Sequence, residues 1–192
     1  MMKDHSLTGF GYKRKSNDFY PTPQWVTRAL MDRETFEGTI WECASGNGAM
    51  AEVIGTYGYS VFASDLRTGK DVYGNEGIDF LKSDRIQSNI ITNPPFKLAE
   101  EFVEHGLKLC VKKLCLLAKL SFLEGQRRYT MFKNTPLKTV YVFSKRPSFT
   151  DQPNKGLLAY AWFVWEKGYV GDPVIKWIEP ENKRLKSQKT LI

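Results

Sequence analysis

The amino-acid sequence predicts an α/β fold built around a mostly parallel β-sheet. Short apolar segments typical of strands alternate with segments of helical periodicity, and this alternation favours parallel strands joined by right-handed crossovers. The distinctive glycine and polar residues follow strand segments, which is where ligands bind in open α/β sheets. A length of 192 residues, with 42% hydrophobic and 26% charged residues, fits one globular domain and excludes a disordered or fibrous chain.

Runs of apolar and β-branched residues predict the strands. They lie at residues 39–43, 60–64, 88–92, 113–120, 139–143 and 159–165. Apolar side chains at helical spacing predict helices after Pro23, over residues 49–57 and over residues 98–112, with Thr22 as the N-cap of the first helix. Because no helical pattern separates the last two strands, we expect them to form an antiparallel hairpin at one edge of the sheet.

The charge balance indicates an anionic partner. The chain has 28 Lys and Arg against 21 Asp and Glu, a net charge of +7, which favours nucleic acid first and an acidic membrane surface second. We expect a flexible basic arm at residues 1–18, one domain at residues 19–180 and a basic tail at residues 181–192. The arm contributes three candidate nucleic-acid contacts, Lys13, Arg14 and Lys15.

The apolar runs, cysteines and histidines favour a cytoplasmic protein without a metal. The longest apolar run, residues 157–165, is much shorter than the roughly 20 residues that cross a membrane. The first residues are polar, so we expect no signal peptide. Cys43, Cys110 and Cys115 lack paired spacing, which fits reduced thiols that serve packing. With 2 histidines and no Cys/His cluster, we expect no metal site.

Candidate cofactor residues gather at strand ends. Glu42 lies at the end of the first strand segment, and the glycine turn at residues 46–48 lets backbone approach a ligand closely. An acid at Glu42 suits a cationic or amine-bearing cofactor better than a pyrophosphate. Asp65, after the second strand, is placed to accept both hydroxyls of a ribose. Asp79 and Phe80, in an apolar patch near a third strand end, are placed to hydrogen-bond to and stack on an adenine.

The turn Asn93-Pro94-Pro95-Phe96 after the strand at 88–92 is the most informative motif. Its prolines lock the backbone and lack N–H groups, which keeps nearby carbonyls free of helix or sheet bonds. The Asn93 side-chain oxygen and the Pro94 carbonyl are then placed to accept both protons of one exocyclic amine, beside the stacking face of Phe96. Holding both N–H bonds out of the ring plane frees the nitrogen lone pair, and this interaction strengthens in the transition state.

In this order, the motifs resemble S-adenosylmethionine-dependent DNA adenine-N6 methyltransferases. The residues that carry the resemblance are the glycine turn after Glu42, then Asp65, Asp79-Phe80 and the turn at residues 93–96. Residues 19–23 resemble the extra cofactor-binding motif of that family, placed before the glycine turn as in its gamma arrangement. The resemblance covers residues 17–167. It implies a Rossmann-like methyltransferase fold with a mostly parallel seven-stranded sheet and a C-terminal antiparallel hairpin.

The resemblance implies a role for each matching residue. S-adenosylmethionine would be bound by Tyr20, Thr22, Glu42, Ser45, Gly46, Gly48, Asp65, Asp79 and Phe80. The target base would be held by the catalytic residues Asn93, Pro94, Pro95 and Phe96. Further candidate DNA contacts are Arg127, Arg128 and Arg146, although a solvated helix face explains the first two equally well.

Few residues follow Lys145, and two strands must come from them, which leaves no room for a separate target-recognition domain. We therefore expect DNA as the partner, with low or short sequence specificity. Compact phage-encoded methyltransferases are similar in this respect, and for such an enzyme the location would be the host cytoplasm. The sequence does not indicate an oligomeric state.

Three other functions stay open at this point. The same turn would accept the two protons of a protein glutamine amide or serve an RNA base, although residues 19–23, and Phe96 in place of Tyr, favour DNA. The pattern Gly46-x-Gly48-x-x-Ala51 also fits an NAD-dependent oxidoreductase, against which Glu42 and the two prolines argue. A non-catalytic nucleic-acid-binding module with a retained fold is the third, and the intact motifs argue against it.

Overall fold

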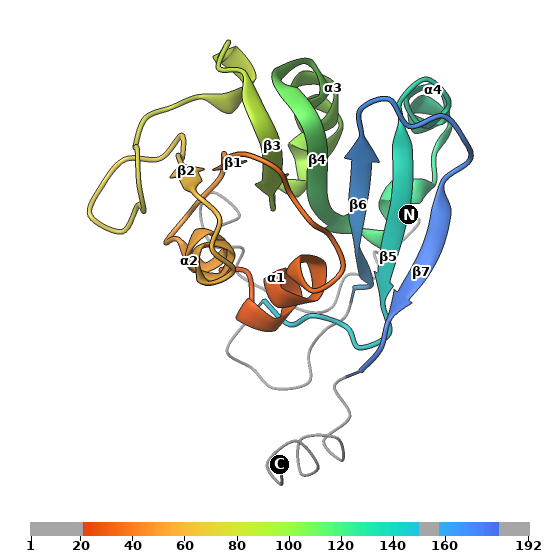
Figure 1. Ribbon diagram of the computed structural model, residues 1–192, viewed down its shortest axis with the longest axis horizontal. Helices are drawn as coiled ribbons and strands as arrows, with labels where there is room; N and C mark the ends of the chain where they lie inside the picture. The colour runs from red at the N-terminus through yellow and green to blue at the C-terminus, as the bar shows by residue number, and fades with distance from the viewer. Residues whose placement is uncertain (1–20, 150–157, 181–192) are drawn as a thin grey trace, which may run out of the picture.

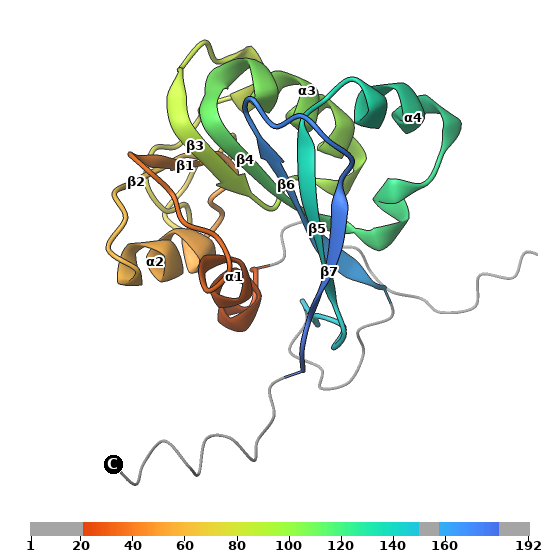
Figure 2. The same ribbon diagram turned by 45° about the vertical axis from the view of Figure 1, so that its right-hand side comes forward.

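The computed structural model describes residues 21–149 and 158–180, in which a seven-stranded β-sheet lies between two layers of helices (Figure 1). The basic arm predicted at residues 1–18 and the tail predicted at residues 181–192 lie outside the described residues. Helices α1 and α2 cover one face of the sheet and α3 and α4 the other, as Figure 2 shows.

The strands follow the order β2-β1-β3-β4-β6-β5-β7 across the sheet. Their bounds are Ile40–Glu42 for β1, Val61–Ala63 for β2, Gln87–Thr92 for β3, Cys110–Lys119 for β4, Leu137–Phe143 for β5, Tyr160–Glu166 for β6 and Val174–Ile178 for β7. Every neighbouring pair is parallel except those made by β6, which runs antiparallel to both β4 and β5. This is the mostly parallel α/β sheet that the sequence predicts.

Three of the four helices lie where the sequence predicts them, and the last has no predicted counterpart. Helix α1 spans Gln24–Met31, α2 Ala49–Thr56, α3 Ala99–Leu109 and α4 Gln126–Lys133. Short 3-10 turns lie at Phe80–Lys82 (η2), Phe96–Leu98 (η3) and Leu120–Leu123 (η4). None of the helices in the described part of the chain combines the length and apolar character that crossing a membrane requires.

Three local predictions need correction. Strands β5 and β6 pair antiparallel as expected, but they do not form the edge, because β7 adds to the outer side of β5. The apolar patch around Asp79 and Phe80 leads into the turn η2 and does not follow a strand. Thr22 does not cap α1, because Pro23 occupies the N-cap position and makes no side-chain cap bond.

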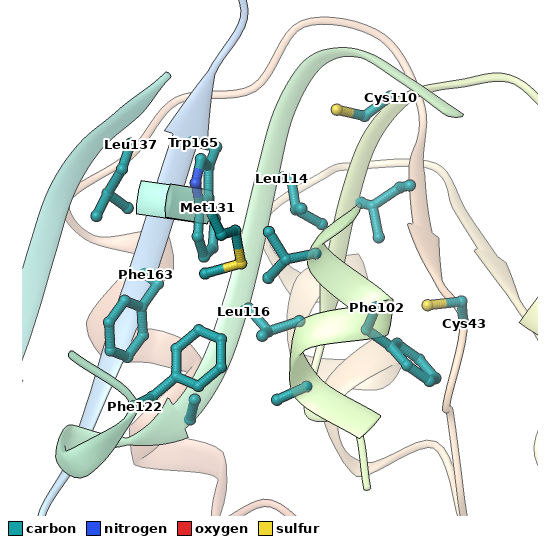
Figure 3. Packing of buried hydrophobic residues seen from close by; sticks show 14 of the residues in the cluster. Cys43, Phe102, Cys110, Leu114, Leu116, Phe122, Met131, Leu137, Phe163 and Trp165 are labelled. Carbon is teal, nitrogen blue, oxygen red and sulfur yellow. The ribbon is translucent and has the colours of Figure 1, made fainter. Parts of the chain in front are cut away.

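The central strands are buried on both faces, which explains their nearly continuous apolar sequences. Alternate residues of β4 and β6 enter opposite cores: Leu114 and Phe163 pack on the α3 side, whereas Cys115 and Trp162 pack on the α1 side. Figure 3 shows the α3-side core, where residues of β4 and β6 meet Phe122 and Phe102. All three cysteines are buried and unpaired, in agreement with a packing role.

A buried polar network joins the segment after α1 to the far half of the sheet. Glu34 accepts hydrogen bonds from the Tyr141 hydroxyl (2.8 Å) and from the Lys113 ammonium (2.6 Å). Lys113 also lies 3.4 Å from Glu166, which pairs with Lys138 at 2.9 Å. Burial, together with the Glu34 acceptor, raises the pKa of Tyr141. The network therefore fixes α1, which precedes the candidate site, onto β4 and β5.

We predict that Glu34→Ala destabilises the protein strongly. The substitution leaves the mostly buried Lys113 ammonium without its shortest partner and the Tyr141 hydroxyl without its acceptor. Breaking a buried ion pair costs on the order of 3 kcal/mol. Urea unfolding measures the loss, with Glu37→Ala as the matched control, because the Glu37 side chain is exposed in its pair with Lys112. Equal unfolding midpoints for the two variants would contradict a stabilising role for the network.

Candidate active site

A cavity of about 840 Å³ opens at the carboxyl ends of β1, β2 and β3. It brings together nearly all the described residues that the sequence predicts for the site. These are Thr22, Glu42, Ser45, Gly46, Asp65, Asp79, Phe80, Asn93, Pro94, Pro95 and Phe96. Tyr20 lies outside the described residues, and Gly48 lies behind the cavity wall. The described residues hold no cluster of three or more His, Cys, Asp or Glu side chains that could bind a metal.

The loop that follows β2 holds the glycine turn in place. The Ser45 hydroxyl donates to the Tyr73 carbonyl (2.7 Å), and the Tyr73 N–H donates to the Gly46 carbonyl (2.9 Å). Gly48 has a φ of 86°, and a Cβ atom there would lie 2.4 Å from the Tyr73 ring. Because Gly48 has no side chain, the Tyr73 ring can pack directly against the turn. Gly46 and Ser45, by contrast, line the cavity.

Asp65 joins the ends of β1 and β2. One carboxylate oxygen accepts the Gly46 N–H (2.7 Å) and a long bond from Arg67 Nη2 (3.5 Å), and the other accepts the backbone N–H (2.8 Å) and Nε (3.1 Å) of Arg67. A carboxylate has roughly four lone-pair positions. These bonds occupy them, so acceptance of both hydroxyls of a ribose requires Arg67 to release its side-chain bonds. Arg67 is a cavity residue that the sequence motifs do not single out.

Glu42 is a buried acid without a positive partner among the described residues. The residue is 1% exposed, and its Oε1 accepts hydrogen bonds from the Thr92 hydroxyl (3.0 Å) and the Ala44 N–H (3.4 Å). Burial raises the pKa of Glu42 to about 8, the Asp65 charge adds to the rise, and the two hydrogen bonds oppose it. Glu42 is therefore mostly protonated at neutral pH, and a cation in the cavity would favour its ionised form.

The Asn93 side chain has one satisfied group and one unsatisfied group. Its Nδ2 donates to the Thr22 hydroxyl oxygen (3.0 Å), whereas Oδ1 is buried and has no hydrogen-bond partner among the described residues. An unpaired buried acceptor costs about 1–3 kcal/mol. Thr27 Oγ1 and Asn89 Oδ1 also lack a partner among the described residues, but of these three residues only Asn93 lines the cavity, so its Oδ1 is the one available to a ligand there. The contact also explains why Thr22 does not cap α1: its hydroxyl faces Asn93. Sequence periodicity gives no signal for this pairing.

Asp79 and Phe80 have more structural roles than expected. Asp79 accepts the Leu81 N–H (3.1 Å), which caps η2, and pairs with Lys82 at 3.2 Å. Phe80 is 2% exposed, and its ring packs against the rings of Trp41, Phe102 and His105. This packing covers most of the ring, while Phe80 also lines the cavity, so its contact with an adenine stays a prediction.

The predicted DNA contacts divide into three groups. The Arg128 guanidinium donates to the carbonyls of Phe122 (2.8 Å), Ser121 (3.3 Å) and Glu124 through Nε and Nη2, so it holds the η4 segment, and its contact with DNA stays a prediction. Arg127 is 82% exposed and pairs with Glu100 at 3.2 Å, while Arg146 is exposed. Lys13, Arg14 and Lys15 lie outside the described residues.

Comparison with known proteins supports the fold. No protein-family model and no curated protein matches the sequence. Three similar solved structures are a protein described as a class I S-adenosylmethionine-dependent methyltransferase from Listeria monocytogenes, the modification subunit of a protein described as a type I restriction enzyme from Vibrio vulnificus YJ016, and magnesium protoporphyrin IX methyltransferase from Synechocystis PCC 6803 with bound S-adenosylmethionine.

The similarity to these three structures covers most of the chain at low sequence identity. The Listeria protein has a TM-score of 0.61 at 11% identity, over 86% of this chain and 67% of that chain. The Vibrio subunit has a TM-score of 0.59 at 14% identity, over 92% of this chain and 54% of that chain. The Synechocystis enzyme has a TM-score of 0.51 at 12% identity, over 74% of this chain and 76% of that chain. The fold is therefore the Rossmann-like fold of S-adenosylmethionine-dependent methyltransferases, and the sheet matches the sequence prediction.

We predict that Glu42 makes the ligand-free protein less stable as the pH rises. The unfolded chain releases the Glu42 proton near pH 4.5, whereas the folded protein keeps it until about pH 8. The folded state binds more protons in this range, so stability falls across it. Thermal unfolding of Glu42→Gln should show a midpoint that exceeds the wild-type midpoint by an amount that grows with pH. Parallel pH profiles for the two proteins would show that Glu42 is already ionised.

Proposed function

We propose that this protein transfers a methyl group from S-adenosylmethionine to the exocyclic N6 amine of adenine in DNA. The observation that carries the proposal is the buried Oδ1 of Asn93, which has no partner in the described part of the chain and lies at the wall of the cavity that Glu42 also lines. This acceptor begins a turn whose two prolines donate no N–H. The site thus offers hydrogen-bond acceptors where the protons of an amine need to be held.

The cavity residues fit the proposed cofactor by charge. S-adenosylmethionine supplies, when bound, an electrophilic methyl group on a positively charged sulfur. Glu42 has no positive partner among the described residues, and its pKa is raised to about 8. A cationic ligand would supply that partner and favour the ionised carboxylate. Thr22, Ser45, Gly46 and Asp65 would hold the rest of the cofactor, with Asp65 accepting ribose hydroxyls in place of the Arg67 side chain. A pyrophosphate-bearing dinucleotide fits the buried acid Glu42 poorly.

The two oxygen atoms that would accept the amine protons explain how an aromatic amine becomes nucleophilic. The Asn93 Oδ1 and the Pro94 carbonyl would each accept one amine proton and hold both N–H bonds out of the base plane. The Thr22 hydroxyl fixes the amide by accepting from Nδ2, which leaves Oδ1 directed to the substrate. These bonds strengthen as charge develops on the nitrogen, so they lower the barrier more than they stabilise the bound base.

Charge favours DNA over a protein substrate. The net charge of +7 suits a polyanion, and a duplex would bind through phosphate contacts that weaken steeply with salt. The similarity in fold to a restriction-enzyme modification subunit is in keeping with this choice. A glutamine amide also carries two protons in a plane, so a protein substrate is the second candidate for the same turn.

Incubation with labelled S-adenosylmethionine tests the proposal. Separate reactions contain duplex DNA, RNA or a mixture of proteins, and digestion to nucleosides or amino acids identifies the labelled product. We expect label in N6-methyladenine from DNA. Label in glutamine or only in RNA would overturn the substrate, and no transfer to any of them despite tight DNA binding would support a non-catalytic module.

Asn93→Ala should abolish methyl transfer while S-adenosylmethionine binding is largely retained. Loss of a group that stabilises developing charge typically lowers kcat by about 100-fold or more. Measurement of kcat and of the cofactor dissociation constant separates the two effects. Asn134→Ala, at an exposed asparagine that ends α4, is the matched control and should keep full turnover. Near-normal turnover of Asn93→Ala would remove Asn93 from the catalytic residues.

A further inference from the structure

A second, smaller hollow of about 120 Å³ shares Phe96 with the main cavity. It is formed by the ends of β4 and α3 together with η4 and α4. Its lining residues are Phe96, Ala99, Ala118, Lys119, Ser121, Phe122 and Arg128. Phe96 lines both spaces, so whatever occupies the hollow is a direct neighbour of the base-binding turn.

The hollow carries positive charge. Of the described residues, Lys119 and Arg128 are the charged ones in its lining, and no Asp or Glu among them lines it. Within residues 21–149 and 158–180, Lys119 forms no ion pair, and its ammonium lies 5.1 Å from the centre of the Phe96 ring. Glu100 on α3 and Arg127 on α4 pair with each other at 3.2 Å. The chemistry of the hollow therefore suits a small anion.

The two positively charged side chains are held in place to different degrees. Arg128 is held by three backbone carbonyls, so it fixes the wall and contributes charge without moving. Lys119 ends β4 on a long flexible stem, and its ammonium contacts a ring face and no acceptor among the described residues. A compact ammonium on a four-carbon stem is suited to contact a phosphate as a point charge.

We propose that this hollow is a phosphate subsite, in which Lys119 contacts a backbone phosphate of the nucleic acid whose target base lies at Asn93–Phe96. The inference rests on the proposed function and specifies its substrate class as one that carries phosphate. A peptide glutamine brings no anion to this position and would leave the Lys119 charge uncompensated.

The position of Lys119 links this subsite to base binding. The ammonium lies over the Phe96 ring, and Phe96 lines both the hollow and the main cavity. A phosphate held by Lys119 would therefore lie next to a residue of the base-binding turn.

Salt-dependent binding of a fluorescent duplex oligonucleotide tests the subsite. Lys119→Met should weaken binding and reduce the slope of log affinity against log salt concentration by about one. Lys119→Arg should restore the slope. Lys108→Met removes the same charge from an exposed position at the other end of α3 and serves as the matched control, with an unchanged slope. Lys119→Gln replaces Lys119→Met if the latter fails to fold.

The outcomes separate this inference from the proposed function. If Lys119→Met keeps the wild-type slope, or loses no more than Lys108→Met, the phosphate subsite is wrong whether or not the enzyme methylates DNA. If the wild-type protein transfers no methyl group to adenine but the slope still falls in Lys119→Met, the subsite stands and the proposed function is wrong. Unchanged S-adenosylmethionine binding in Lys119→Met shows that the effect lies on the substrate side.

Discussion

A buried carboxyl group without a counter-charge among the described residues is the constraint on which the candidate site depends. Glu42 lies at the end of strand β1, where burial and the Asp65 charge favour its protonated form, whereas the bonds from the Thr92 hydroxyl and the Ala44 N–H favour its ionised form. Thr92 is the last residue of β3, and the next residue, Asn93, holds Thr22. Two consecutive residues therefore tie the acid on the cofactor side to the amide on the acceptor side.

This arrangement places two unfavourable groups of the protein in one cavity. The cavity contains an isolated acid and a buried amide oxygen with no partner among the described residues, each of which costs folding free energy when no ligand is bound. Around the start of β4, by contrast, Glu34, Tyr141 and Lys113 satisfy one another. The pairing of an isolated acid with an unpaired acceptor in the same cavity supports a functional site there.

Much of this could be predicted from the sequence, because strand periodicity and strand-end turns are local signals. The six predicted strands and the grouping of Glu42, Asp65 and Asn93 around one cavity followed from them. Strand β7 was missed because four of its five residues are exposed, so it has no buried face to produce a pattern. The Thr22–Asn93 bond, the burial of Phe80 and the carbonyl contacts of Arg128 depend on residues that only the tertiary fold brings together.

Calorimetric titration of the protein with S-adenosylmethionine tests the central claim most directly, because that claim is a cavity made for a cationic cofactor around Glu42. The account predicts saturable binding at one site, accompanied by proton release at neutral pH as Glu42 ionises. NAD should give no binding under the same conditions. Saturable binding of NAD, or no binding of S-adenosylmethionine by the correctly folded protein, would contradict the account.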